Sequence, residues 1–163
     1  MTNCDGLWAE LVDLSPRMST IRVSLFNDCP DEIVKRIHQA IYDPAQRGAA
    51  FELIHWMHRN QRTGFLPDLI ELASYGHLYT EAARAAILGL PRRWLIENIE
   101  AAYDPIVRRE FVRRESASEE EFGLLLSLLE EVDSSLAKEF AQRATKHRNQ
   151  EIRNLGTAYL SRS

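Results

Sequence analysis

One glutamate and two histidines are the residues best spaced for metal chemistry. Glu52, His55 and His58 form the pattern Glu-x-x-His-x-x-His, which places the three side chains on adjacent turns if the segment is helical. A dinuclear carboxylate site would need Glu-x-x-His on a second helix, and the sequence has none. A single zinc ion would need a ligand from elsewhere, for which His38 and His77 are the candidates. We favour a polar helix face with ordinary histidines, and we predict neither a metal nor a cofactor.

Signatures of other catalytic chemistry are missing. The sequence contains no Gly-rich phosphate loop, no His-Glu-x-x-His and no Gly-x-Ser-x-Gly, the patterns of nucleotide binding, zinc hydrolysis and serine nucleophiles. Neither Cys4 nor Cys29 has a nearby cysteine, which argues against a zinc site or a redox pair. One Cys4–Cys29 bridge is conceivable, but we favour free thiols in a reducing cytosol. We predict that the protein is not an enzyme and has no catalytic residue.

Two basic stretches, 92–94 and 108–114, could form a binding surface. Arginines four residues apart share a helix face, and an aromatic ring beside them suits a phosphate or an acidic partner. The candidate partner-binding residues are Arg93, Trp94, Arg109 and Arg113. Interleaved glutamates support a second interpretation, a solvated face with ion pairs along the helix. Those glutamates are Glu97, Glu100, Glu110 and Glu115.

The composition is that of a folded protein of ordinary polarity. The chain has 163 residues, of which 45% are apolar and 27% charged, with a formal net charge of −4. This length suits one domain with a sizeable core, and the acidic balance disfavours nucleic acid as a partner. No stretch reaches the ~18 apolar residues that span a membrane, and the N-terminus lacks the early Lys or Arg of a secretory signal. We predict a cytoplasmic protein that makes no membrane contact.

The elements that must position these residues are helices. Leu7, Trp8, Leu11 and Leu14 share one helix face before Pro16, and we expect them to cap the end of a helix stack. Residues 18–27 alternate like a strand, but because no second strand is available, we favour a helix there too. Later segments predict about ten helices in all, with breaks at Asp43, Gly64, Gly76, Pro91 and Asp104.

Three helices carry more specific expectations. The helix from Asp43 to about Asn60 places Trp56 in the core. The helix before Gly76 ends on that glycine in the left-handed conformation. Ser118 with Glu121 is a capping box, and it introduces a helix with leucines on every side, which we expect to be buried on more than one side.

A short string occurs twice. The first copy reads Asp43-Pro44-Ala45-Gln46-Arg47 and the second reads Asp104-Pro105-Ile106-Val107-Arg108. In each, Asp can cap a new helix and Pro can occupy its first position, where an N–H would have no partner. Two further expected helix starts also place Arg four residues after the cap. The four pairs are Asp43/Arg47, Thr80/Arg84, Asp104/Arg108 and Asn149/Arg153.

Asp-Pro-Ile-Val-Arg resembles the start of the second helix in HEAT repeats, and the first copy departs from it at Gln46. The resemblance covers roughly residues 30–162. It implies a right-handed α-solenoid of stacked antiparallel helix pairs, in which the repeated Asp and Arg side chains join neighbouring repeats. We therefore expect one all-α domain over 1–163. Residues 1–29 would be capping helices, 30–115 the clearest repeats, and 116–163 less regular helices.

The resemblance leaves three functional hypotheses. The first is a protein-binding scaffold, adaptor or single-partner inhibitor, such as a bacterial immunity protein. The second is a nucleic-acid-binding protein that uses the arginine face, as some HEAT-like proteins do. The third is a lyase of the repeat class that acts on bilin chromophores, although no residue of this sequence supports it specifically.

Overall fold

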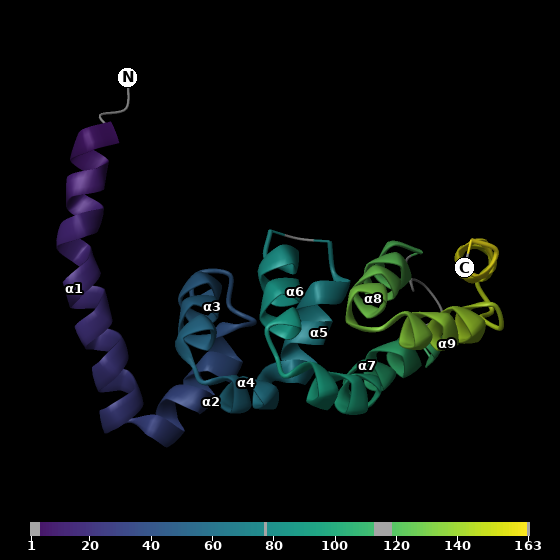
Figure 1. The fold of residues 1–163 in the computed structure, drawn as a ribbon, viewed down its shortest axis with the longest axis horizontal. Helices are drawn as coiled ribbons and strands as arrows, with labels where there is room; N and C mark the ends of the chain where they lie inside the picture. Colours follow the sequence, from purple (N-terminus) through teal and green to yellow (C-terminus); the bar gives the residue numbers. More distant parts are fainter. Residues whose placement is uncertain (1–3, 77, 113–118, 163) are drawn as a thin grey trace. The chain divides into compact units, whose positions relative to one another are not determined.

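The computed structural model describes residues 4–76, 78–112 and 119–162, with backbone alone for Asp5 and for residues 108–112. In these residues the chain is all-helical and contains no strand. The elements are α1 (Cys4–Asp28), α2 (Pro30–Ala40), α3 (Arg47–Trp56), α4 (Arg59–Arg62), the 3-10 turn η1 (Thr63–Phe65), α5 (Leu66–Ser74), α6 (Thr80–Leu88), α7 (Arg92–Val112), α8 (Glu119–Val132), α9 (Ser134–Ala144) and α10 (Gln150–Leu160). Figure 1 shows them along the chain.

The chain divides into two compact units. Unit 1 is Met1–Leu53 and unit 2 is Ile54–Ser163, so the division falls within α3. In unit 1, α1 contacts α2, and α2 buries Ile33, Ile37 and Ala40.

Helix α1 is continuous, so the two separate helices expected on either side of Pro16 are wrong. A proline inside a helix removes the hydrogen bond to the carbonyl four residues earlier, here that of Val12. Both Val12 and Pro16 are exposed, and water can satisfy that carbonyl. A helix of this length also separates Cys4 from Cys29 by about 37 Å, at 1.5 Å per residue, so one chain cannot form the Cys4–Cys29 bridge. Both cysteines are free and exposed.

The apolar residues expected to cap a stack are instead on the surface. Trp8 is 66% exposed and Leu7 is 55% exposed. Leu11 and Leu14 are exposed as well. These four side chains therefore make no buried cap.

In unit 2, each helix from α5 onward packs against helices close to it in the chain. Consecutive helices pack against each other in four pairs: α5 with α6, α7 with α8, α8 with α9, and α9 with α10. Further contacts join α5 to α7, α6 to α8, α8 to α10, and α5 to α8. Figure 1 shows α5 and α6 side by side. The largest fully buried side chains of this unit are Ile54, Phe65, Leu69, Ile70, Ile87, Ile99, Leu125, Leu128, Leu129 and Phe140.

The leucine-rich helix α8 is at the centre of this packing. Its buried residues are Phe122, Leu125, Leu126, Leu128, Leu129 and Val132. It contacts α5, α6, α7, α9 and α10. The expectation that it is buried on more than one side is confirmed. Its predicted capping box includes Ser118, which lies outside the described residues.

The two Asp-Pro strings do not have equivalent places in the fold. Asp43 precedes α3, and its carboxylate accepts a hydrogen bond from the N–H of Ala45 at 2.9 Å. Asp104 and Pro105, by contrast, lie inside the continuous helix α7. The helix start predicted at Asp104 is therefore wrong. As at Pro16, the proline is exposed, and so is Ala101, whose carbonyl loses its helical partner.

Three further expectations from the sequence are wrong. Helix α3 ends at Trp56, whose side chain is 54% exposed and not part of the core. Gly76 has no left-handed conformation, since no glycine in the described part of the chain has a positive φ. Tyr79, not Thr80, is the N-cap of α6, and the Thr80 hydroxyl donates to the carbonyl of Tyr75.

Candidate interaction surface

Arginines dominate the polar contacts, and they fall into groups by what they bind. Arg47 donates from Nε to the carbonyl of Ile41 at 2.6 Å and from Nη2 to that of Tyr42 at 3.4 Å. Arg153 donates from Nη1 to the carbonyls of His147 at 2.8 Å and Arg148 at 2.7 Å. In both cases the acceptors are six and five residues before the arginine. The guanidinium therefore satisfies carbonyls where the preceding helix has ended.

The polar residues four positions before these two arginines also make the same kind of hydrogen bond. Asn149 is the N-cap of α10, and its side-chain oxygen accepts from the N–H of Glu151 at 2.9 Å. Asp43 accepts from the N–H two residues later in the same way. Arg62 makes a related contact that the sequence analysis missed, from Nε to the carbonyl of Met57 at 2.9 Å. The signal was available, since Arg62 follows the end of α3 as Arg47 follows the end of α2.

Arg84 belongs to a second group, which joins helices. Its side chain crosses from α6 to α8, where it donates to the carbonyl of Leu124 at 3.1 Å and to the hydroxyl of Ser127 at 3.2 Å. It also forms an ion pair with Glu131. Arg84 is only 6% exposed. Arg84 therefore joins neighbouring helices, as the resemblance implies for the repeated arginines. Arg47 and Arg153 do not follow that expectation, because each binds the turn before its own helix.

Arg143 joins α9 to α7 in the same manner. It contacts Asp104 at 2.7 Å and Glu100 at 3.2 Å. Its guanidinium carbon lies 5.7 Å from the centre of the Tyr103 ring, within the range of a cation–π contact. Burial, and secondarily the charge of Glu100, raises the pKa of the Tyr103 phenol. Asp104 is thus the acceptor of an inter-helix arginine.

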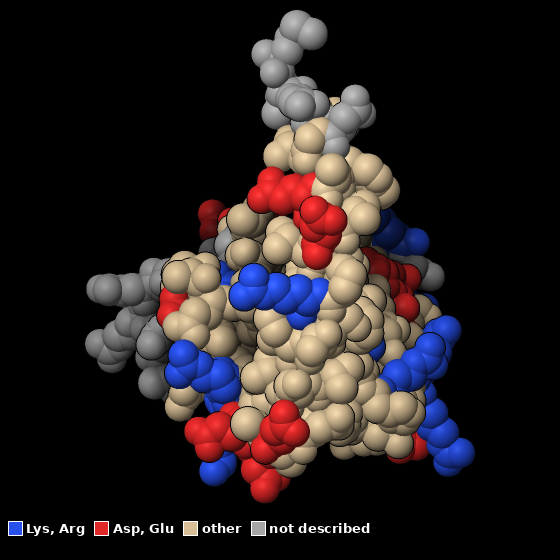
Figure 2. All heavy atoms as spheres, turned by 90° about the vertical axis from the view of Figure 1, so that its left-hand side faces the viewer, with Lys and Arg blue, Asp and Glu red and all other residues tan. Residues whose placement is uncertain are grey.

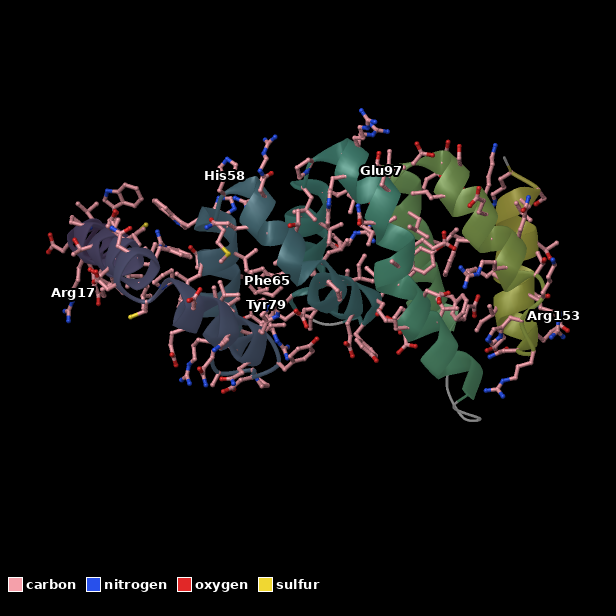
Figure 3. The ribbon with its side chains drawn as sticks, turned by 90° about the horizontal axis from the view of Figure 1, so that it is seen from below. Arg17, His58, Phe65, Tyr79, Glu97 and Arg153 are labelled. Carbon is pink, nitrogen blue, oxygen red and sulfur yellow. The ribbon has the colours of Figure 1, made fainter. Side chains whose placement is uncertain are left out.

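Arg93 differs from these arginines because its side chain is 93% exposed. It lies in the first turn of α7 and meets Glu97 at 3.2 Å, a residue one turn later whose side chain is 58% exposed. Trp94 is half-buried beside it. Figure 3 marks Glu97 on α7 and Arg153 on α10.

The structure places only part of the predicted binding surface. Arg93 and Trp94 are adjacent on α7. The side chain of Arg109, and with it that of Arg108, lies outside the described residues, and so does Arg113. The candidate surface is therefore defined by Arg93 and Trp94.

The predicted polar helix with three potential metal ligands is interrupted. Glu52 forms an ion pair with Arg22 at 3.0 Å. His55 is in α3, but His58 lies beyond the end of that helix and is the N-cap of α4. Its Nδ1 accepts from the N–H of Asn60 at 3.4 Å. Across 4–76, 78–112 and 119–162, no group of three or more His, Cys, Asp and Glu side chains is arranged to hold a metal.

His147 is a polar residue of the core that sequence analysis did not single out. It is 2% exposed, and its ring centre lies 5.2 Å from that of Phe122. Its Nδ1 accepts from the N–H of Asn149 at 3.0 Å, in the turn before α10. Burial, and then the charges of Arg148 and Arg153, lower the pKa of this imidazole. The neutral form therefore closes the turn.

A hollow of about 390 Å³ lies between α8 and α10. Its lining includes Leu126, Leu155, Ala158 and Tyr159, with Glu119 and Arg162 among the polar residues. The lining therefore combines apolar and polar side chains.

Compared with protein-family models, with curated proteins and with solved structures, the chain matches none of them. No helix within the described ranges is long and apolar enough to cross a membrane.

Proposed function

We propose that this protein is a non-enzymatic protein–protein interaction module that binds its partner through a helical-repeat surface. Arg93 carries the proposal. Arg47, Arg84 and Arg153 bind groups of their own chain, whereas the Arg93 side chain is 93% exposed next to Trp94. Arg and Trp are the side chains most enriched among residues that dominate binding energy.

The underlying architecture in this proposal is a HEAT-like right-handed α-solenoid. Two observations support it. The principal contacts of unit 2 join helices near one another in the chain, as in repeat proteins. Arg47 and Arg153 also make the same pair of turn contacts at two distant junctions. Because Asp104 lies inside α7, the repeated turn contact is restricted to the junctions at Asp43 and Asn149.

In this proposal the rigid helices hold an anchor pair for an acidic protein surface. The ion pair between Arg93 and Glu97 is exposed and is worth little in water. An incoming carboxylate can therefore replace Glu97 at small cost. An adaptor, a scaffold and a single-partner inhibitor such as a bacterial immunity protein would all work in this way.

A pull-down from lysate of the source cell, with and without nuclease, tests the proposal. We expect a stoichiometric protein partner that survives nuclease, is retained by Arg59→Glu, and is lost with Arg93→Glu. Arg59 is the matched control because it is an exposed arginine on a different helix, α4. Equal capture by wild type and Arg93→Glu would remove Arg93 from the binding surface.

Nucleic-acid binding is the second candidate, favoured only by the predicted arginine run 108–114. If it is correct, nuclease treatment removes every captured partner, and the affinity falls steeply as salt rises.

A further inference from the structure

Helix α1 carries a seam of apolar residues with the spacing of a coiled coil. Successive members are separated by four, three, four, three and four positions, which is a heptad repeat in its core positions. The seam residues are Leu7, Leu11, Leu14, Met18, Ile21 and Leu25. The helix has 25 residues, more than three heptads. This length is enough for a two-stranded pairing.

Five of the six seam residues are exposed on the surface of unit 1, and Leu25 is half-buried. Leu7, Leu11 and Ile21 are 55%, 53% and 51% exposed, and Leu14 and Met18 are 43% and 41% exposed. Figure 2, in which α1 faces the viewer, shows largely uncharged surface interrupted by acidic and basic side chains. When a second surface covers such a row of large apolar groups, the free energy is lowered because apolar surface is removed from water.

Pro16 is compatible with pairing. In the heptad frame it falls opposite the seam, and it is exposed. The ring and the unpaired carbonyl of Val12 therefore face away from the covered side.

We propose that α1 pairs with α1 of a second copy of this chain as an antiparallel coiled coil. The seam is symmetric about Pro16, so an antiparallel alignment matches every layer. Leu7 meets the partner's Leu25, Leu11 meets the partner's Ile21, and Leu14 meets the partner's Met18. Each layer joins the two kinds of core position, as antiparallel packing requires.

The charges of α1 favour this orientation over a parallel one. Glu10 and Asp13 precede Pro16, whereas Arg17 and Arg22 follow it. A parallel pair would place like charges side by side. In the antiparallel pair the two Arg17 side chains approach each other at the two-fold axis, and each also lies on the same flank and nearly the same level as the partner's Asp13. On the other flank Trp8 lies beside the partner's Arg22, which also holds Glu52 of its own chain at 3.0 Å.

Sedimentation equilibrium on the full chain, with a matched pair of substitutions, tests self-association. Ile21 lies in the seam and is 51% exposed, whereas Val23 lies opposite it and is 55% exposed. We expect a wild-type dimer that Ile21→Glu weakens roughly 100-fold, because each dimer buries the changed side chain twice, and that Val23→Glu leaves unchanged. Circular dichroism confirms that both variants remain folded. A wild-type monomer at all concentrations, or a dimer that survives Ile21→Glu, overturns the proposal.

The two native cysteines report the orientation. One chain cannot join Cys4 to Cys29 across α1, but the antiparallel pair brings Cys4 beside the partner's Cys29. Under mild oxidation we expect a Cys4–Cys29 disulfide between chains, identified by mass spectrometry of unreduced peptides. Either Cys4→Ser or Cys29→Ser then abolishes cross-linking. Cys4 lies three residues before Leu7 and continues the seam, so a parallel pair would instead leave a Cys4–Cys4 link in Cys29→Ser. That result overturns the antiparallel arrangement.

Discussion

At the scale of single residues, His147 makes stability depend on pH. Its pKa is lowered in the folded chain by burial, so the unfolded chain binds the proton more readily. Stability is therefore complete above the ordinary histidine pKa of about 6.5 and falls as pH decreases below it. We expect His147→Gln to flatten the dependence of unfolding free energy on pH between about 7 and 5, measured by urea denaturation.

An exposed histidine provides the control for that measurement. His55→Gln, in α3, should retain the wild-type slope. If His147→Gln keeps that slope as well, the imidazole does not control the turn before α10.

Asp104 also acts through its 2.7 Å pair with Arg143. We expect Asp104→Ala to destabilise the protein by about 1 kcal/mol, discounted for partial solvent exposure. The physical reason is loss of the ion pair between α7 and α9, not loss of a helix cap.

A double-mutant cycle distinguishes these two causes. Asp104→Ala and Arg143→Met should couple by roughly 0.5–1 kcal/mol in chemical denaturation. Zero coupling would point to an effect of Asp104 on α7 alone.

At the scale of helices, the contact between α9 and α10 depends on a glycine. A Cβ at Gly156 would lie 2.6 Å from the carbonyl oxygen of Ala141 and 3.0 Å from Cβ of Ala144. Because these are backbone and short side-chain atoms, the two helices would have to separate. We expect Gly156→Ala to lower the unfolding free energy by about 1–3 kcal/mol.

Gly123 is the matched control, since it is also helical but has room. A Cβ there would meet only Cδ1 of Leu155, at 3.9 Å. Gly123→Ala should stabilise by up to about 1 kcal/mol through helix propensity. Thermal melts of both variants check the contrast, and equal effects would argue against close packing at Gly156.

Helical periodicity predicted the all-helical class and the burial of α8, because apolar spacing reports the buried face directly. Helix boundaries at prolines were not predictable from the string alone. Pro16 and Pro105 each resemble a helix start or stop, yet both are exposed inside helices. Whether water can reach the freed carbonyl depends on the tertiary environment, which local sequence does not encode.

The candidate site was predictable only in part for a similar reason. Arg47 and Arg153 follow a local rule, since their acceptors lie in the preceding turn. Arg84 has the same spacing from Thr80, but its acceptors lie 40 or more residues away on α8. A contact of that range depends on helix packing and leaves no short-range signal.

At the scale of the whole molecule, the two units should differ in local stability. The buried side chains of unit 2 include most of the core, whereas α1 in unit 1 is almost entirely exposed. We expect hydrogen exchange, followed by mass spectrometry, to be slowest in α5, α8 and α9.

Protection of α1 in the same experiment should be low in dilute protein and rise with protein concentration, because the proposed pairing of α1 between two copies would cover it. Protection of α8 should not change with concentration. Uniform protection across both units would contradict the division after Leu53.

The exposure of Trp8 also has a spectroscopic consequence. Trp8 and Trp56 are 66% and 54% exposed, whereas Trp94 is half-buried. Indole emission shifts to the blue when water is excluded, so the intrinsic fluorescence of the protein contains a signal from α1 that needs no added label. In a Trp56→Phe background, a blue shift on raising the protein concentration would come from the environment of Trp8.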